Sequence, residues 1–259
     1  MKFVNICHRH FNQSSANIVL SSLVALLVLM TFLTICKPAK ITALEIGNPT
    51  EKEKNEWVAQ FWNWRVAQPP VENGECVMND RGIVVMLMET AQESQMTRNP
   101  IEQNCRILAN QSIMIPLWVA WCDTAIPEHR DFRGERLAQC AREEYNLGHI
   151  QSSVKVDGLP VARLDVMMKM PPGTPEYLAP PVNVTEFSSE QFNIFIPPTT
   201  PKGEQGSGNF PAGSHGWWVF LDPLPPGEHT ISYNTRVDPV TADVTVLGAE
   251  NITYSLQVT

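Results

Sequence analysis

The main part of the chain holds four histidines whose imidazole rings could support metal or acid–base chemistry. Imidazoles that are distant in a sequence can converge on copper or zinc, yet these four form no H-x-H or H-x3-H pair. No run after residue 45 brings Cys, His and Met together as a blue-copper loop does. We therefore predict no metal site and no cofactor. The four are His129, His149, His215 and His229.

A serine, Ser214, directly precedes His215, which raises the question of a serine hydrolase. Neighbouring side chains of an extended chain point to opposite faces, and a nucleophile and its base normally come from separate segments. The sequence also lacks the G-x-S-x-G elbow of many hydrolases. The catalytic residues, if any, therefore stay unknown, and we take His215, Trp217 and His229 as candidate ligand-binding residues.

Four cysteines follow the N-terminal segment, and their even number predicts two disulfides in an exported domain. They are Cys76, Cys105, Cys122 and Cys140. Three pairings are possible, and the cost of loop closure favours near neighbours, so we expect Cys76–Cys105 and Cys122–Cys140. Zinc sites usually bring two cysteines within a few residues of each other, whereas these cysteines are 29, 17 and 18 residues apart.

An uncharged apolar run, IVLSSLVALLVLMTFLTIC, occupies residues 18–36. Its nineteen residues roughly match the thickness of a bilayer core, and the basic residues before it favour a cytoplasmic N-terminus. We predict a cytoplasmic segment at 1–17, a transmembrane anchor or uncleaved signal at 18–36 and a linker at 37–47. The protein is then a single-pass cell-membrane protein whose domain is extracytoplasmic. Cleavage of the leader is the alternative, and it would make the protein secreted.

The charge of the exported part is strongly negative. From Glu45 onward the chain holds 15 basic and 27 acidic residues. Such a surface repels phosphate backbones, so nucleic acid is excluded as a partner. The expected contacts are the membrane, through residues 18–36, and an unknown surface ligand or protein partner.

Residues 48–148 are predicted to form a small mixed α/β part. Asn48 is typical of a helix N-cap, and the aromatic spacing in WVAQFWNW predicts a helix that packs on the domain core. An aromatic ligand platform is the alternative for this stretch. The other predicted elements are strands at 82–90 and 112–121 and a helix at 131–147. Pro116 predicts an edge or a bulge in the second strand.

Residues 149–259 are predicted to form a β-sandwich-like part, because short strands alternate with turns. The pair Asp157-Gly158 is a preferred hairpin turn. Along GWWVFL, alternation predicts Trp217 and Trp218 on opposite faces. Other strands are expected at 191–196, 228–237 and 251–258, with a long loop at 197–213. The fold class is therefore mainly β: an antiparallel β-sandwich-like domain with a small α/β N-terminal part and an N-terminal transmembrane helix.

Several motifs together carry a resemblance to a known family. They are the Trp-rich FWNW, the paired cysteines within C-x5-GIVVML and NCRI, then VDGLPV, GWWVFLDPLPPGEHTISY and the closing ITYSLQV. In this order they resemble a family of uncharacterised exported prokaryotic proteins, over most of the chain after Glu56. The resemblance implies export and a largely β fold, and it implies no established activity. The family has Gln-x-Gly where this chain has Asp80-Arg81-Gly82, so no role is carried over for that Gln.

Two classes of function follow from these patterns. The first is a binding or structural protein at the cell surface, and this class is the one we expect. The alternative is an extracytoplasmic hydrolase with a site near the 203–217 loop. A hydrolase should show a deep pocket with His215 or His229 near a carboxylate, whereas a binding module should show a shallow aromatic face.

Overall fold

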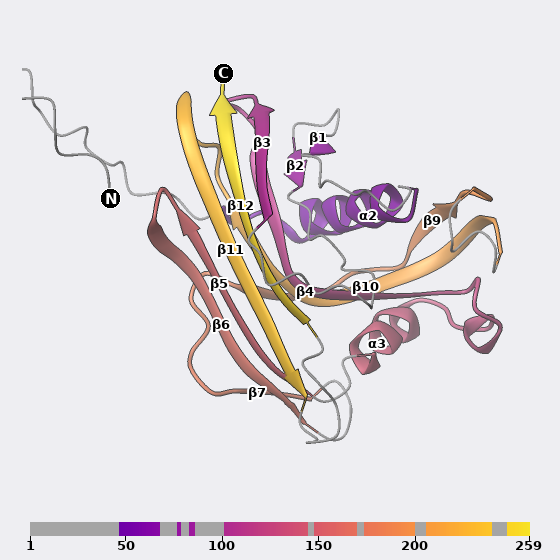
Figure 1. Ribbon diagram of the computed structural model, residues 1–259. Helices are drawn as coiled ribbons and strands as arrows, with labels where there is room; N and C mark the ends of the chain where they lie inside the picture. Colours follow the sequence, from indigo (N-terminus) through magenta and orange to yellow (C-terminus); the bar gives the residue numbers. More distant parts are fainter. Residues whose placement is uncertain are drawn as a thin grey trace, which may run out of the picture. The chain divides into compact units, whose positions relative to one another are not determined.

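The computed structural model describes residues 47–67, 77–78, 83–85, 101–144, 148–169, 174–199, 206–239 and 248–259 (Figure 1). All of them belong to one compact unit, Leu44–Thr259. The predicted anchor at 18–36 lies outside the described residues. Among the helices that are described, none is both long and apolar enough to cross a membrane.

In the described part of the chain, twelve strands form two six-stranded sheets. Sheet A contains β1 (Val77–Met78), β2 (Ile83–Val85), β4 (Ser112–Asp123), β10 (Gly208–Leu221), β8 (Thr185–Ser188) and β9 (Phe192–Ile196). Sheet B contains β3 (Ile101–Ile107), β12 (Gly248–Val258), β11 (Gly227–Pro239), β5 (Gly148–Val156), β6 (Leu159–Lys169) and β7 (Thr174–Tyr177). Most pairs are antiparallel, as predicted, but β2–β4 and β3–β12 are parallel. Both sheets are therefore mixed.

The main hydrophobic core lies between the two sheets. Strand β5 alternates buried and more exposed residues along its length, as a strand with one buried face must. Its buried residues Ile150, Val154 and Val156 share a core with Ile115 of β4 and Trp217 of β10. Burial of such apolar surface is the dominant favourable term in folding, and here it fixes sheet B against one face of sheet A.

The hairpin predicted at Asp157-Gly158 is confirmed. Strands β5 and β6 pair directly across this turn, and both turn residues have positive φ, 51° for Asp157 and 78° for Gly158. Two positive φ angles define the tight turn whose twist matches the flanking strands. The local sequence therefore sets the turn, while the register of the two strands shifts by one residue between Val154 and Lys155.

Strand β10 is the central element of sheet A, and both of its faces are buried. Trp217 and Val219 contribute to the core between the sheets, whereas Trp218 and Phe220 belong to a second core. This result confirms the predicted alternation. The pairing with β4 shifts between Trp217 and Trp218, opposite Pro116, so the predicted irregularity at the proline is a bulge.

Helix α2 (Glu51–Ala67) covers the second core. Its cap is Thr50 and not the predicted Asn48: the Thr50 backbone N–H donates to Glu53 Oε2 at 2.8 Å, and Glu53 N–H donates to Thr50 Oγ1 at 3.3 Å. This reciprocal pair is a capping box, which satisfies two N–H groups at once. The helix buries Phe61 against Trp218, with ring centroids 5.4 Å apart. It packs on the core, as predicted.

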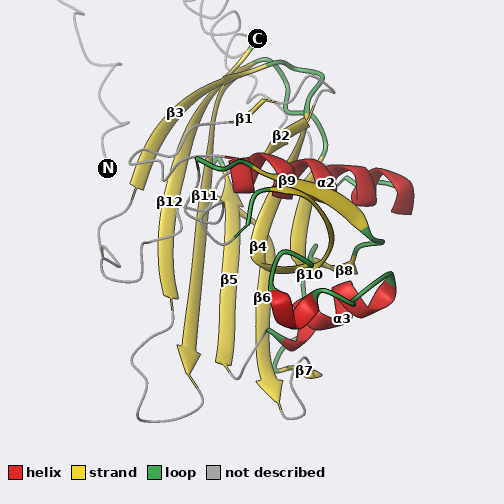
Figure 2. Ribbon diagram, turned by 90° about the vertical axis from the view of Figure 1, so that its right-hand side faces the viewer, coloured by secondary structure: helices red, strands yellow, loops and turns green. Residues whose placement is uncertain are grey.

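Helix α3 (Glu135–Glu143) follows a 3-10 turn, η1 (Pro127–His129), and lies on the other side of β4 and β10 from α2 (Figures 1 and 2). The helix approaches β10 closely at Gly213. A Cβ atom on this glycine would lie only 2.6 Å from the backbone nitrogen of Ala138. The absence of a side chain at Gly213 is therefore what lets α3 pack on the strand.

One correction follows for the predicted layout. Residues 208–213 were expected in a loop, but they form the first half of β10, where residues 208–212 pair with β9 and Gly213 pairs with Cys122 of β4. Strand pairs also cross residue 148, since β4 pairs with β10 and β3 with β12.

Candidate functional site

A polar cluster forms where β8 and β10 pair, and the register of the two strands sets its membership. His215 lies opposite Ser188, and Trp217 lies opposite Glu186. Directly opposed residues point to the same face of a sheet, and alternation places both pairs on one face. Two cross-strand pairs therefore bring a serine, a histidine, a carboxylate and an indole together.

The imidazole of His215 is the buried member of this cluster. Its side chain is 2% exposed, Nδ1 lies 2.8 Å from Ser188 Oγ, and Nε2 lies 3.6 Å from Glu186 Oε1. Burial, together with the nearby Arg142 guanidinium, lowers the pKa of His215 to about 4. At neutral pH the ring is therefore uncharged.

Glu186 joins His215 to two other elements. The Tyr177 hydroxyl, from β7, donates to Glu186 Oε2 at 2.5 Å, and the guanidinium of Arg142, from α3, lies 3.4 Å from Oε1. Trp217 Nε1 donates to the Tyr177 hydroxyl at 3.1 Å. Partial burial, together with Glu186, raises the pKa of Tyr177 to about 12. Shifted pKa values of this kind gather at functional sites, although structural networks produce them too.

The serine next to His215 in space is Ser188 and not Ser214. Ser214 points to the opposite face, where its Oγ accepts from Trp62 Nε1 at 2.7 Å and donates to the Ala120 carbonyl at 2.8 Å. This geometry confirms that Ser214 and His215 point apart. Ser188, His215 and Glu186 lie in the order of a nucleophile, a base and an acid, but the 3.6 Å from His215 Nε2 to Glu186 Oε1 is longer than a hydrogen bond.

His229 lies on β11, and it does not join the His215 cluster. Its Nδ1 lies 2.8 Å from Asp157 Oδ2, and its Nε2 lies 2.9 Å from the Pro225 carbonyl oxygen. It lines an open depression of about 830 Å³, which we call the β11–β12 depression. The depression is lined by Asn104, Cys105, Arg106, Asp157, Glu228, His229, Thr230, Ser255, Leu256 and Gln257. Among these described lining residues there is no Trp, Tyr or Phe, so the aromatic face expected of a binding module is not found here.

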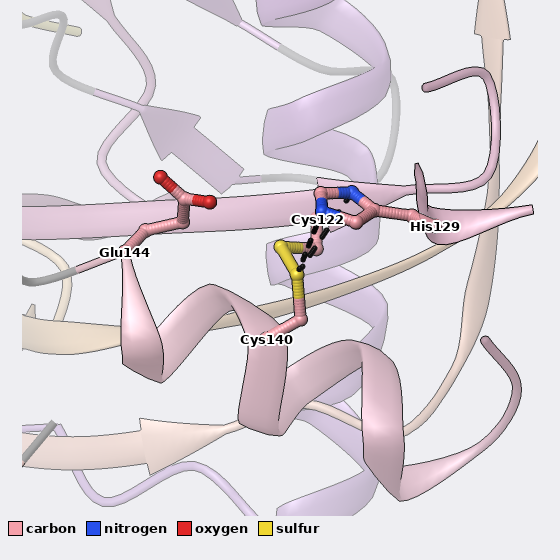
Figure 3. Close-up of side chains that lie close together, drawn as sticks. All are labelled: Cys122, His129, Cys140 and Glu144. Carbon is pink, nitrogen blue, oxygen red and sulfur yellow. Dashed lines mark hydrogen bonds between the residues drawn. A yellow bond between two sulfur atoms is a disulfide. The ribbon is translucent and has the colours of Figure 1, made fainter. Parts of the chain in front are cut away.

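The predicted disulfide between Cys122 and Cys140 is confirmed, with the two Cα atoms 5.8 Å apart. Cys105 is disulfide-bonded as well, and Cys76, its predicted partner, lies outside the described residues. His129 lies beside the first bridge, with Nε2 3.6 Å from Cys140 Sγ (Figure 3). The bridge fastens the end of β4 to α3.

Of the predicted site residues, the structure thus brings His215 and Trp217 together and places His229 in another site. The predicted 203–217 loop is described only from residue 206, and it is strand from Gly208. Searches among protein-family models, curated proteins and solved structures found no match.

Proposed function

We propose that the protein is an exported, membrane-tethered binding protein of β-sandwich-like architecture. Its ligand is a neutral, hydroxyl-rich molecule of the saccharide class, and it binds in the β11–β12 depression. One observation carries this proposal: a depression of about 830 Å³ is lined almost wholly by hydrogen-bonding side chains. Ligand sites commonly have volumes of about 300–1,000 Å³.

The depression is built from two rows of side chains across three strands. One row is Glu228, Gln257 and Arg106, and the other is Thr230, Ser255 and Asn104. All six are exposed. Because neighbouring strands are about 4.8 Å apart, each row spans about 10 Å, which suits one or two sugar rings.

The chemistry of the rows favours a neutral ligand. Arg106 supplies donors, Glu228 supplies acceptors, and the amides and hydroxyls supply both. Asp157 already contacts His229 Nδ1 and accepts from the Thr230 N–H at 2.8 Å. The lining holds one positive side chain, Arg106, and two carboxylates, on Asp157 and Glu228, so an anion is disfavoured, while the amides and hydroxyls suit a neutral ligand.

The export part of the proposal rests on the apolar run at 18–36 and on the cysteines. Disulfides persist in oxidising compartments and are rare in the cytosol, and Cys105, Cys122 and Cys140 are all disulfide-bonded. The acidic balance of the chain argues against a nucleic-acid partner. A surface glycan or a free saccharide is the partner that fits these features.

The test is calorimetric titration of the full chain, in detergent micelles, with a panel of neutral and uronic-acid oligosaccharides. Arg106→Ala should weaken binding of the neutral sugar about tenfold or more, because a hydrogen bond to a charged group contributes about 1.5–3 kcal/mol. Asn234→Ala is the matched control, since Asn234 is exposed on β11 but does not line the depression. Binding that Arg106→Ala leaves unchanged, or no binding by any sugar, would contradict the proposal.

The line Ser188–His215–Glu186 supports hydrolysis as a second candidate. Ser188 is exposed, and the neutral imidazole 2.8 Å from its hydroxyl can accept a proton. A base with so low a pKa is weak near neutral pH, which is why this candidate ranks second. A fluorophosphonate probe should label Ser188 if the candidate holds, Ser188→Ala should abolish labelling, and Ser255→Ala should leave it intact. No labelling of the folded wild type would exclude it.

A further inference from the structure

We propose that Cys122, His129, Cys140 and Glu144 form a redox-gated site for a zinc-class divalent cation. The oxidised state holds the Cys122–Cys140 disulfide, and the reduced state offers two thiolates, an imidazole and a carboxylate. Their ligand atoms all lie within 4.8 Å of one another. This inference is independent of the proposed saccharide binding, because none of the four residues lines the β11–β12 depression.

Three separate elements bring the four side chains together. Cys122 lies near the end of β4, and His129 is the last residue of the turn η1. Cys140 is in α3, and Glu144 is the residue that caps this helix, four positions later. Residues four apart lie on the same face of a helix. Figure 3 shows all four side chains in the space between the helix and the strand.

The ligand set suits tetrahedral zinc, and so does the distance from one sulfur to the imidazole. The two sulfurs are bonded to each other in the oxidised state, and after reduction they must move to about 3.8 Å apart to share the ion. Zinc takes Cys sulfur at about 2.3 Å and His nitrogen at about 2.0–2.1 Å, so a tetrahedral site separates S and N by about 3.5 Å. The observed distance from Cys140 Sγ to His129 Nε2 is 3.6 Å. Two thiolates, one imidazole and one carboxylate supply the four ligands that a structural zinc site requires.

The surroundings hold the imidazole in position and leave a way in for the ion. The His129 ring stacks on Phe132, with ring centroids 5.0 Å apart and planes 20° apart. Both cysteines are buried, His129 is partly exposed and Glu144 is exposed. An ion can therefore arrive from the solvent side, through Glu144 and His129, and reach the sulfur atoms last.

The gating step is an ordinary thiol–disulfide exchange. A dithiol reductant supplies two electrons and two protons: its two thiols become one disulfide, and the Cys122–Cys140 bond becomes two thiols. Zinc binding then displaces the two thiol protons, since only thiolates are ligands. Exchange with a disulfide oxidant reverses the process: that disulfide accepts two electrons and becomes two thiols, the Cys122–Cys140 bond forms again, and the ion loses both sulfur ligands and is released.

The test uses Co²⁺ as the probe, because thiolate coordination gives it a charge-transfer absorption. The full chain is titrated with Co²⁺, then with Zn²⁺ in competition, before and after reduction. We expect one ion per reduced chain and none per oxidised chain. The reference is Cys122→Ala/Cys140→Ala in the same reduced state, which keeps the other cysteines and reports any ion they bind.

Two further variants test the remaining ligands. His129→Gln and Glu144→Gln should each weaken Co²⁺ binding. For His129→Gln we expect a loss of affinity of about tenfold or more, because mutating even the residues that hydrogen-bond to metal ligands lowers metal affinity by about 10–100-fold. His149→Gln and Glu143→Gln are the matched controls, and they should leave the affinity unchanged. Circular dichroism reports whether each reduced variant is folded.

The proposal is overturned if the reduced chain binds no more Co²⁺ than the double alanine variant. It is equally overturned if His129→Gln and Glu144→Gln bind as tightly as wild type, because the thiols would then act alone. If the reduced chain unfolds, refolding on addition of Zn²⁺ supports the site. Continued unfolding with the metal present counts against it.

Discussion

Ser188 and His215 face each other directly across the pairing of β8 and β10, and the serine hydroxyl lies 2.8 Å from Nδ1 of the ring. The serine is exposed, whereas the histidine side chain is 2% exposed. This pair therefore links the protein surface to a buried titratable group. Buried imidazole favours the neutral form, and the stability of the fold should depend on that form.

We predict that acid destabilises the protein through His215. The folded pKa of about 4 is below the ordinary value of 6.5, so the unfolded chain binds the proton more readily. Stability from this group is complete above pH 6.5 and is lost as the pH falls from 6.5 towards 4. The loss is on the order of 3 kcal/mol, because one unit of pKa corresponds to about 1.4 kcal/mol.

Urea unfolding measured from pH 7 to pH 4 checks this prediction. His215→Gln should flatten the curve in this window relative to wild type. Carboxylates titrate in both proteins, so the difference between the two curves is the quantity of interest. Parallel curves for wild type and His215→Gln would contradict the assignment.

The Tyr177 hydroxyl should stabilise the contact between β7 and β8. It donates to Glu186 and accepts from Trp217 Nε1, so Tyr177→Phe removes two hydrogen bonds while keeping the ring. We expect a loss of about 1–2 kcal/mol in the free energy of unfolding, since one such bond contributes about 0.5–1.5 kcal/mol. Thermal unfolding at pH 7 measures it. A stability equal to wild type would mean that water replaces the hydroxyl.

Truncation of either central tryptophan should cost about 3–5 kcal/mol, as for other fully buried aromatic residues. Trp217 and Trp218 are both 0% exposed, but they lie in different cores. Trp217→Ala should loosen the packing of the two sheets, and Trp218→Ala should loosen α2. Hydrogen exchange distinguishes these effects. Phe195→Ala, at an exposed position, is the control and should change stability by less than about 0.5 kcal/mol.

Local patterns in the sequence were enough for part of the fold. The turn at Asp157-Gly158 and the alternation of Trp217 and Trp218 depend only on neighbouring residues, and both predictions are confirmed. The first half of β10 was missed because its Gly, Pro and Ser residues are typical of loops. Tertiary context overrides that composition, since residues 208–212 pair with β9. The capping box at Thr50 was visible in the sequence, as Thr and Glu three residues apart.

Less of the site could be predicted, because its residues come together only when strands that are distant in the sequence pair with each other. His215 and Trp217 were singled out, but Glu186 and Ser188 join them only through the register of β8 and β10. No local spacing signals that register. The same limit applies to Cys122, His129 and Cys140, whose spacing does not resemble a zinc motif although the fold brings them within 4.8 Å.

Gly213 should be intolerant of a side chain. A Cβ there would lie 2.6 Å from the Ala138 nitrogen and 2.8 Å from Leu137 Cβ, so Gly213→Ala must push α3 away from β10. We expect a cost of about 1–3 kcal/mol or more, as for other overpacked sites. Gly158→Ala is the comparison: its φ is 78° and nothing lies within 4 Å of the added Cβ, so it should cost only the strain of a positive φ, about 1–2 kcal/mol. Equal protection of α3 against hydrogen exchange in Gly213→Ala and wild type would contradict this explanation.

The Cys122–Cys140 bridge should be a major source of stability in the oxidised protein. It closes a loop with a sequence separation of 18 residues, for which the chain-entropy account gives about 3 kcal/mol. Against a typical total of about 5–15 kcal/mol, this loss is large. Cys122→Ala/Cys140→Ala leaves small apolar groups beside Ala141 and avoids burying new polar atoms. Guanidinium unfolding of wild type and the double variant, both oxidised, measures the difference in the free energy of unfolding. A difference below about 1 kcal/mol would contradict the entropic estimate.

The pairing of the cysteines is checked by peptide mapping of unreduced wild type, which should find Cys105 joined to Cys76. A peptide joining Cys105 to Cys122 would contradict this pairing.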